Sequence, residues 1–269
     1  MTRVTVLGAS GRMGKALVRL LAAAGGLELA GALAEQGDAA VGRDAGQVAG
    51  LEPLGIRVTS DLGDALRGAQ VAIDFTAPAA AEGHARACAD AGIALVVGTT
   101  GLDGTQVAAL ESAASRIPVL YARNMSLGVT VLTELARQAA ALLGPGFDIE
   151  IIEAHHRDKK DAPSGTALQL GEAVAGARGQ KLADVAVYAR SGISTESRAP
   201  EAIGFAAVRG GAIVGDHTVL LAGGEELVEL THRATDRALF ARGALRAAGW
   251  LAGKPAGLYS LREVLGLPA

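Results

Sequence analysis

The chain has 269 residues, half of them hydrophobic, and a formal net charge of −3 at pH 7. This slight acidity disfavours a general nucleic-acid binder, and an aromatic content of 3% leaves few side chains that can stack on bases. No apolar run reaches the roughly 18 residues of a membrane span, and the N-terminal residues enter a strand without the pattern of a signal peptide. The single cysteine, Cys88, cannot form an internal disulfide. We therefore expect a soluble cytoplasmic protein.

Short β-branched runs alternate with alanine-rich helical segments in the first half of the chain. Strands are predicted at 3–7, 27–33, 56–59, 71–76, 93–98 and 118–122, and helices at 12–24, 79–91 and 105–115. Nearly continuous apolar strands that alternate with helices are typical of a parallel sheet covered on both faces. The first half therefore predicts an α/β fold with a Rossmann-like, doubly wound parallel sheet.

The pattern changes near Asn124. A predicted helix at 128–143 leads into a long strand at 147–156, and a helix at 166–177 precedes strands at 185–189, 203–209, 213–221 and 227–234. Successive strands after an α/β region predict a smaller α+β domain with a mixed sheet. A last helix, at 236–250, and a short tail are expected to pack back on the first domain. The predicted domains are thus 1–126 with 236–269 for dinucleotide binding, and 127–235 for substrate binding and oligomerisation.

A glycine-rich loop follows the first strand and opens the first helix. Its glycines are Gly8, Gly11 and Gly14, with Ser10 and Arg12 between them. Glycines in this place let the backbone turn sharply and approach a pyrophosphate, which the helix N-terminus also favours. The spacing differs from the usual Gly-x-Gly-x-x-Gly, and a tight turn without a ligand is the alternative. The position between strand and helix favours nucleotide binding.

Glu35 follows the second strand, where an acidic residue often binds the adenosine ribose. Its carboxylate would repel a 2′-phosphate, which favours NADH over NADPH. A solvated loop carboxylate is the alternative interpretation.

The segment 151–166 contains four of the ten histidines and lysines of the chain: His155, His156, Lys159 and Lys160. Adjacent strand residues point to opposite faces, so the two histidines are not expected to bind one metal, and no third ligand supports a metal site. Histidine titrates near neutrality and is suited to proton transfer. Together with the glycine loop, this segment predicts hydride transfer to an anionic substrate, completed by a proton. A solvated basic loop is the alternative.

A helix begins directly after this basic segment. Thr166 and Gln169 fit the spacing of a capping box, Ser/Thr-x-x-Glu/Gln. The first turn of the helix would then present backbone N–H groups and the Thr166 hydroxyl to a carboxylate.

These motifs resemble a known family. Residues 8–14, 73–76, 98–101, 122–129, 153–166, 203–205 and 214–218 are similar to segments of 4-hydroxy-tetrahydrodipicolinate reductase, also called dihydrodipicolinate reductase, of bacterial lysine and diaminopimelate synthesis. The resemblance covers nearly the whole chain, and the segment 153–166 is its most specific part. It implies a homotetramer that reduces a cyclic dicarboxylate, 4-hydroxy-tetrahydrodipicolinate, to tetrahydrodipicolinate with NADH or NADPH.

The resemblance also implies roles for individual residues. His155 and Lys159 match the catalytic residues that exchange protons. The substrate carboxylates are held by residues matching His156, Gly165 and Thr166. The cofactor is bound by residues matching Gly8, Ala9, Ser10, Gly11, Arg12, Met13, Gly98, Thr99, Thr100, Ala122, Arg123, Asn124 and Met125. No metal is implied.

Two departures from the family pattern are expected to matter. Ala34-Glu35 stands where better-known members carry Glu-Arg, which leaves the choice between NADH and NADPH open. Asp158 lies between Arg157 and Lys159, where it is expected to pair with a neighbour and weaken the local positive field.

Two other functions remain as alternatives. A nucleotide-binding sensor would keep the fold and lose turnover, and a semialdehyde or amino-acid dehydrogenase would share the glycine loop. The second of these calls for a catalytic cysteine or a different acidic residue, and Cys88 lies in an apolar helical pattern.

Overall fold

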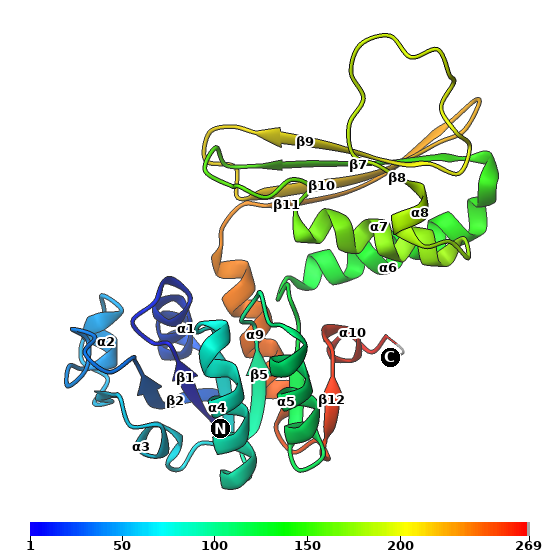
Figure 1. Ribbon diagram of the computed structural model, residues 1–269. Helices are drawn as coiled ribbons and strands as arrows, with labels where there is room; N and C mark the ends of the chain where they lie inside the picture. Colours follow the sequence, from blue (N-terminus) through cyan, green and yellow to red (C-terminus); the bar gives the residue numbers. More distant parts are fainter. Residues whose placement is uncertain (268–269) are drawn as a thin grey trace. The chain divides into compact units, whose positions relative to one another are not determined.

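The computed structural model describes residues 1–267. The chain divides into two compact units, drawn in Figure 1. Unit 1 consists of Met1–Ser126 and the segment from Ala238 onward, and unit 2 is Leu127–Arg237.

Unit 1 is built on a seven-stranded sheet in the order β12-β6-β5-β4-β1-β2-β3. All neighbouring strands are parallel. The strands are β1 (Thr2–Leu7), β2 (Leu27–Leu33), β3 (Val58–Thr59), β4 (Val71–Asp74), β5 (Ala94–Val97), β6 (Pro118–Tyr121) and β12 (Gly257–Tyr259). The prediction of a doubly wound parallel sheet is confirmed, whereas β12, which has three residues, was not predicted.

Helices cover both faces of this sheet. Helix α1 (Arg12–Ala23) packs against α9 (Ala238–Leu251), while α4 (Pro78–Ala91) packs against both α3 (Leu62–Leu66) and α5 (Gly104–Ala114). Two short helices, α2 (Ala45–Val48) and α10 (Leu261–Val264), complete the unit. The four residues of β4 and the four of β5 are all buried, because helices lie on both sides of these strands.

Unit 2 is built on a five-stranded mixed sheet in the order β11-β10-β7-β9-β8. The strands are β7 (Asp148–His155), β8 (Ala186–Val187), β9 (Ile203–Arg209), β10 (Gly215–Ala222) and β11 (Leu227–Ala234). The pairs β7–β9 and β8–β9 are parallel, and β10 runs antiparallel to both of its neighbours. The prediction of a second domain with a mixed sheet is confirmed.

One face of the unit 2 sheet carries the helices. Helices α6 (Leu127–Leu143) and α7 (Gly165–Ala177) pack on each other and on the sheet. The short element η1 (Gly144–Gly146) follows α6, and α8 (Leu182–Val185) follows α7. The core between helices and sheet includes Ile149, Ile151, Leu170 and Phe205. Burial alternates along β7, so Ile149, Ile151, Glu153 and His155 share the helix-covered face. The sequence therefore places a glutamate and a histidine at the end of a hydrophobic row.

Candidate active site

The residues predicted to bind the cofactor lie in loops that follow the strands of unit 1. The loops after β1, β5 and β6 carry residues 8–13, 98–100 and 122–125, and Glu35 follows β2. Because all these strands are parallel, their carboxyl ends meet at one edge of the sheet, which is where open α/β sheets bind ligands. The fold therefore brings the predicted cofactor residues to a common edge.

The glycine loop is tightly folded against the sheet. Gly8 has a φ of 84°, which favours glycine, and the N–H groups of Gly8 and Ala9 both donate to the Leu33 carbonyl at 3.0 and 2.7 Å. A Cβ at Gly14 would lie 2.1 Å from the carbonyl oxygen of Gly8, so only glycine lets α1 pack this closely. Helix α1 begins after Gly11, which supplies no side-chain cap. The N-terminus of α1 is thus suited to a phosphate group.

Ser10 connects the glycine loop to the loop after β2. Its hydroxyl donates to Asp38 at 2.7 Å, and this hydrogen bond is the main cause that holds the pKa of Asp38 below its usual value. Glu35, the residue predicted to bind the ribose, is exposed in the same loop. Asp38 was not predicted from the sequence. The structure therefore places two carboxylates, one of them bonded to Ser10, in this loop.

A buried carboxylate holds the loops after β4 and β5 together. Asp74 accepts hydrogen bonds from the hydroxyls of Thr76 and Thr99 at 2.6 and 3.0 Å, and its other oxygen lies 2.7 Å from Nδ1 of His84. Burial raises the pKa of Asp74, but the hydrogen bonds from His84 and Thr76 outweigh it, so the pKa falls and the group stays ionised. Asp74 therefore fixes the position of Thr99, one of the predicted cofactor residues.

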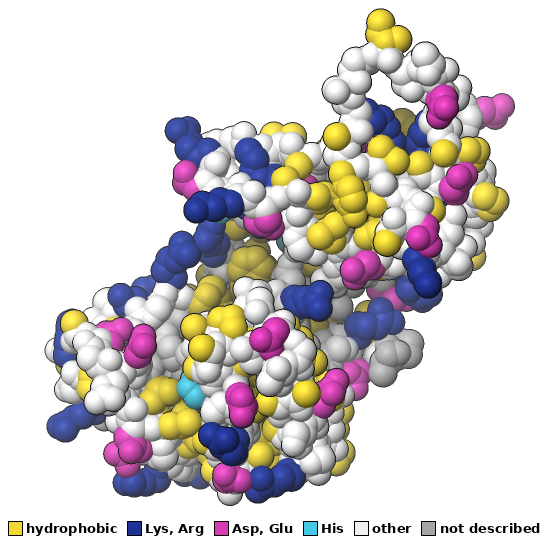
Figure 2. Space-filling view, in the orientation of Figure 1, with side chains coloured by type: hydrophobic (Ala, Val, Ile, Leu, Met, Phe, Trp, Pro, Cys, Tyr) yellow, Lys and Arg dark blue, Asp and Glu magenta, His cyan; other side chains and the backbone are white. Residues whose placement is uncertain are grey.

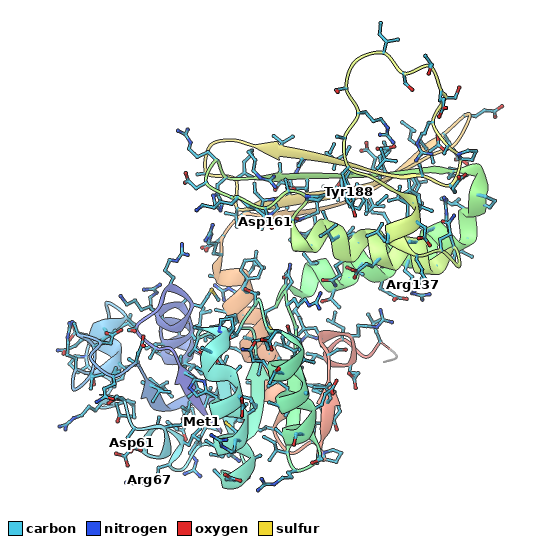
Figure 3. The ribbon with its side chains drawn as sticks, in the orientation of Figure 1. Met1, Asp61, Arg67, Arg137, Asp161 and Tyr188 are labelled. Atoms are coloured by element: carbon cyan, nitrogen blue, oxygen red, sulfur yellow. The ribbon has the colours of Figure 1, made fainter. Side chains whose placement is uncertain are left out.

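In unit 2, the predicted catalytic and substrate residues occupy the connection between β7 and α7. His155 is the last residue of β7 and is buried, His156 and Lys159 are half-buried, and Gly165 opens α7. Figure 2 shows Lys and Arg side chains gathered at this end of the sheet, and Figure 3 labels Asp161 within the connection. His155, His156, Lys159, Gly165 and Thr166 therefore lie between the end of β7 and the first turn of α7.

Glu153 holds the His155 ring. Nδ1 of His155 lies 2.6 Å from Oε2 of Glu153, and Arg209 at the end of β9 donates to both oxygens of Glu153 at 2.7 Å. Burial by itself raises the pKa of Glu153, but the bonds from Arg209 and His155 outweigh it and lower the pKa. Burial, the largest cause, lowers the pKa of His155, and the nearby charges of Lys159 and Arg209 add to this although Glu153 opposes it. His155 therefore tends towards the neutral ring at pH 7.

Lys159 pairs with Asp161, which was not predicted from the sequence. Its Nζ donates to both oxygens of Asp161 at 2.8 and 2.9 Å, and this bond is the main cause that lowers the pKa of Asp161. We expected Asp158 to weaken the local positive field, but Asp158 is exposed and Asp161 is the residue paired with Lys159. The expected pairing was wrong because Asp158 lies in a turn over residues 156–159, closed by the Lys159 N–H donating to the His156 carbonyl at 3.2 Å, and is exposed there.

The prediction of a capping box at Thr166 was also wrong. Helix α7 begins at Gly165, and its N-cap is Ser164, whose hydroxyl accepts from the N–H of Ala167 at 3.2 Å. Thr166 therefore lies inside the first turn. Gly165 and Thr166 are still the first two residues of the helix, where backbone N–H groups point towards an incoming anion.

Ser164 also joins the helix start to the neighbouring strand. Its hydroxyl lies 3.1 Å from Nε2 of His217 on β10, and the His217 ring meets the His155 ring edge-on, with 5.1 Å between centroids. Burial lowers the pKa of His217 to about 4, so this ring is neutral near pH 7.

Sequence reasoning missed Glu153, Arg209, Ser164 and His217 as parts of the site. Only Glu153 had a usable signal, since residues two apart on a strand share a face. Arg209 and His217 are more than 50 residues from their partners, at sequence separations of 56 and 53.

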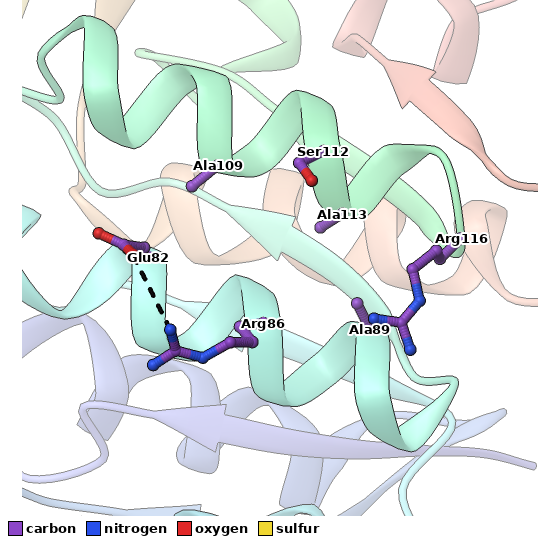
Figure 4. A pocket seen from close by; sticks show the side chains of 7 residues that line it. All are labelled: Glu82, Arg86, Ala89, Ala109, Ser112, Ala113 and Arg116. Atoms are coloured by element: carbon purple, nitrogen blue, oxygen red, sulfur yellow. Dashed lines mark ion pairs between the residues drawn. The ribbon is translucent and has the colours of Figure 1, made fainter.

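Other features of the molecule do not offer comparable chemistry. A groove of about 250 Å³ between α4 and α5 is lined by Ala89, Ala109, Ala113 and Ser112 with Glu82, Arg86 and Arg116, as shown in Figure 4. Arg86 and Arg116 pair with Glu82 and Asp90. Cys88 is fully buried, and burial raises the pKa of its thiol to about 12, which removes it as a nucleophile. Among residues 1–267, no helix has the length and apolar character needed to cross a bilayer.

The fold and the two groups of residues define a two-domain oxidoreductase that uses a nicotinamide cofactor. The comparisons with known proteins give the family. The family models described as "Dihydrodipicolinate reductase, N-terminus" and "Dihydrodipicolinate reductase, C-terminus" match residues 2–125 and 128–265. The chain therefore belongs to the dihydrodipicolinate reductase family.

Relatives and a solved structure agree with this family. The chain is 54% identical to a 4-hydroxy-tetrahydrodipicolinate reductase of Anaeromyxobacter dehalogenans (strain 2CP-1) over 99% of this chain and 98% of that one. It is 55% identical to the enzyme of the same name from Thiobacillus denitrificans over 98% of each chain. Its fold matches "Dipicolinate bound Dihydrodipicolinate reductase from Paenisporosarcina sp. TG-14" with a TM-score of 0.78, at 24% identity and 98% coverage of both chains.

Proposed function

We propose that this chain reduces 4-hydroxy-tetrahydrodipicolinate to tetrahydrodipicolinate, the reaction that gives its relatives their name. The observation that carries the proposal is the segment 155–166, in which a buried histidine, a lysine and a helix N-terminus follow one another. The reaction replaces a ring hydroxyl by hydrogen, so one hydride and one proton enter and one water leaves. When bound, the reduced nicotinamide supplies the hydride.

His155 and Lys159 move the protons in this proposal. The Nδ1 atom of His155 is occupied by Glu153, so Nε2 is the nitrogen that exchanges a proton with the substrate. Lys159 carries an ammonium group, and its ion pair with Asp161 keeps it within the connection between β7 and α7. A neutral imidazole and an ammonium group side by side provide one proton acceptor and one donor.

The two carboxylates of the substrate are assigned to the residues beside this pair. Gly165 and Thr166 form the first turn of α7, and the positive end of the helix favours an anion there. His156 follows His155 and is half-buried at the same end of the sheet. A dianionic ring is thus matched by a helix N-terminus on one side and by basic side chains on the other.

The cofactor is assigned to the glycine loop and to residues 98–100 and 122–125 at the carboxyl edge of the unit 1 sheet. We expect NADH to be preferred over NADPH. Glu35 and Asp38 place two carboxylates in the loop after β2, with Asp38 bonded to the Ser10 hydroxyl, and negative charge there repels a 2′-phosphate. Unit 1 is then the dinucleotide-binding domain and unit 2 the substrate-binding and oligomerisation domain.

The assembly is proposed to be a cytoplasmic homotetramer formed through the sheet of unit 2. The face of this sheet that lies opposite α6 and α7 exposes hydrophobic side chains, among them Ile152, Val208 and Leu227. Exposed hydrophobic side chains on an uncovered sheet face support burial against other copies of the chain.

A coupled assay tests the reaction. The synthase of the preceding step supplies the substrate in situ, and nicotinamide oxidation is followed with NADH and with NADPH in parallel. We expect turnover with both cofactors and a larger kcat/KM for NADH. In Glu35→Arg, kcat/KM for NADPH should increase. Cofactor binding without substrate-dependent oxidation would overturn the proposal and indicate a nucleotide-binding sensor.

A further inference from the structure

We propose that Glu153 is a positioning residue of this enzyme, which fixes the ring and the tautomer of His155 and ties that ring to the start of α7. The effect on catalysis rests on the proposed function, whereas the effect on the His155 ring rests on the contacts of Glu153 alone. Glu153 itself is 1% exposed and acts on the reaction only through the groups it contacts.

One carboxylate joins three elements. Its Oε2 lies 2.6 Å from Nδ1 of His155 on β7, and both of its oxygens accept from Arg209 on β9. Its Oε1 also accepts the backbone N–H of Ser164, the N-cap of α7, at 3.1 Å. The strand that delivers the proton-transfer ring and the helix that starts beside it are therefore attached to the same two oxygen atoms.

Arg209 sets the charge of this carboxylate. It holds Glu153 in a two-point ion pair, and another of its N–H groups donates to the Asp161 carbonyl in the loop that carries Lys159. Because Glu153 stays ionised it can only accept, so Nδ1 of His155 must carry the hydrogen. The lone pair of the neutral ring is then on Nε2.

Gly215 on β10 lies beside the other ring nitrogen of His155. A Cβ at this position would lie 3.0 Å from Nε2 of His155. The charged and titratable groups that face His155 are therefore Glu153 on its own strand, Arg209 on β9, His217 on β10 and Lys159 in the following loop. Among them Glu153 is the one anion, and it is the group that contacts Nδ1 of His155, which makes it the group that selects the tautomer.

Titration of His155 tests the contact without substrate. The chain has five histidines, so 13C-labelled histidine gives a small set of ring signals, and His155→Gln identifies the signal of His155 by its loss. We expect Glu153→Gln to lower the pKa of His155 by about 1 or more, since a neighbouring negative charge is removed. Arg209→Gln is expected to raise it, because a positive charge is removed and Glu153 is left to His155.

Glu150→Gln is the matched control. Glu150 lies three residues earlier on β7, accepts from two arginines, Arg190 and Arg198, and points to the other face of the sheet. It should leave the titration of His155 unchanged. A carboxylate that serves only to stabilise the fold would change the folded fraction in Glu153→Gln and leave the titration of the folded protein as in the wild type.

Kinetics then test the catalytic consequence. Glu153→Gln is expected to lower kcat about 100-fold, the low end of what a displaced proton-transfer group costs, with KM for NADH unchanged. Glu153→Asp keeps the negative charge. It should leave both the pKa of His155 and kcat closer to the wild-type values than Glu153→Gln does.

The outcomes separate this inference from the proposed reaction. An unchanged His155 titration in folded Glu153→Gln overturns the positioning role even in an active enzyme. If Glu153→Gln does not fold, the direction of the His155 pKa change in Arg209→Gln decides. The absence of a rise in that pKa overturns the positioning role. A wild-type protein without turnover overturns the reaction, whereas the titration result is independent of turnover.

Discussion

At the scale of single residues, the site of unit 2 depends on buried groups that neutralise or orient one another. Glu153, His155 and His217 are all buried, yet each has a partner: Arg209 for Glu153, Glu153 for His155, and Ser164 for His217. A buried charge without a partner would be costly, so these groups form a connected set.

Replacing His155 tests its role in proton transfer. His155→Gln should lower kcat by about 100-fold or more, as expected for the loss of a general acid or base. NADH affinity should hardly change, because His155 lies in unit 2 and the glycine loop in unit 1. Steady-state kinetics and a fluorescence titration with NADH measure the two quantities. His156→Gln, for comparison, should mainly raise KM for the substrate, and wild-type turnover in His155→Gln would remove this residue from the mechanism.

The buried His217 makes stability depend on pH. Its pKa is 6.5 in an unfolded chain and about 4 in the folded protein, so the unfolded state binds the proton first as the pH falls. The contribution is fully present above pH 6.5 and is lost on acidification towards pH 4, by roughly 3 kcal/mol at about 1.4 kcal/mol per pKa unit. Urea unfolding across this range should show a shallower decline in His217→Gln. Parallel curves for the two proteins would contradict the prediction.

At the scale of elements, both sites are formed where a helix begins. In unit 1 the chain enters α1 through Gly8 and Gly11, and in unit 2 it enters α7 through Ser164. The two starts differ, because α1 has no side-chain cap whereas the Ser164 hydroxyl caps α7 and contacts His217. The first start is suited to a phosphate, and the second is proposed to hold a substrate carboxylate beside the His155 ring.

The close approach of α1 to the glycine loop predicts the effect of one methyl group. Gly14→Ala would place Cβ 2.1 Å from the Gly8 carbonyl oxygen and 2.6 Å from Cα of Ala9, so the loop or the helix must move. We expect a loss of about 1–3 kcal/mol in the free energy of unfolding and weaker NADH binding. Gly25→Ala is the control, since no atom lies within 4 Å of its Cβ position. NADH binding as tight as in the wild type would show that the packing of α1 does not shape the loop.

The cap of α7 predicts a second effect at this scale. Ser164→Ala removes the hydroxyl that accepts from Ala167, and it should lower the free energy of unfolding by about 1 kcal/mol. Gln169→Ala should change it by less than about 0.5 kcal/mol, because Gln169 is not the partner of the cap. Chemical denaturation of both variants measures the difference. A larger loss of unfolding free energy in Gln169→Ala than in Ser164→Ala would support the capping box predicted from the sequence.

At the scale of the whole molecule, the chain forms two units whose sheets are covered differently. Unit 1 has a parallel sheet with helices on both faces, whereas the sheet of unit 2 has helices on one face only. Figure 2 also shows hydrophobic side chains gathered near β8, where Tyr188, labelled in Figure 3, packs on Phe205 with 5.3 Å between ring centroids. We expect other copies of the chain to associate on the uncovered sheet face of unit 2.

A charge on this face tests the proposed tetramer. Val208 is 50% exposed on β9, beside Ala154 of β7 on the uncovered face. Val208→Lys should shift the assembly in sedimentation velocity from four chains to fewer, since a buried ammonium group opposes association. Leu142→Lys is the control, because Leu142 is 86% exposed on α6, on the helix-covered side. A tetramer unaffected by Val208→Lys would place the interface elsewhere.

Periodicity and local motifs in the sequence were enough to predict most of the framework. The strands at 27–33, 203–209 and 227–234 agree with β2, β9 and β11, and the glycine loop lies between a strand and a helix as expected. The short elements α2, α3, α8, α10 and β12 were missed, because three to five residues carry too little pattern to separate a helix or strand from a loop.

The sequence by itself determined the two-unit architecture, the family and the short segment that carries His155 and Lys159, because these depend on patterns within a few residues. Only the tertiary structure decided what holds that segment in place. Arg209 reaches Glu153 from 56 residues away, His217 reaches Ser164 from 53, and Asp38 reaches Ser10 from 28. Such pairs form because buried polar groups require partners, and sheet pairing and loop packing determine which distant residues become those partners.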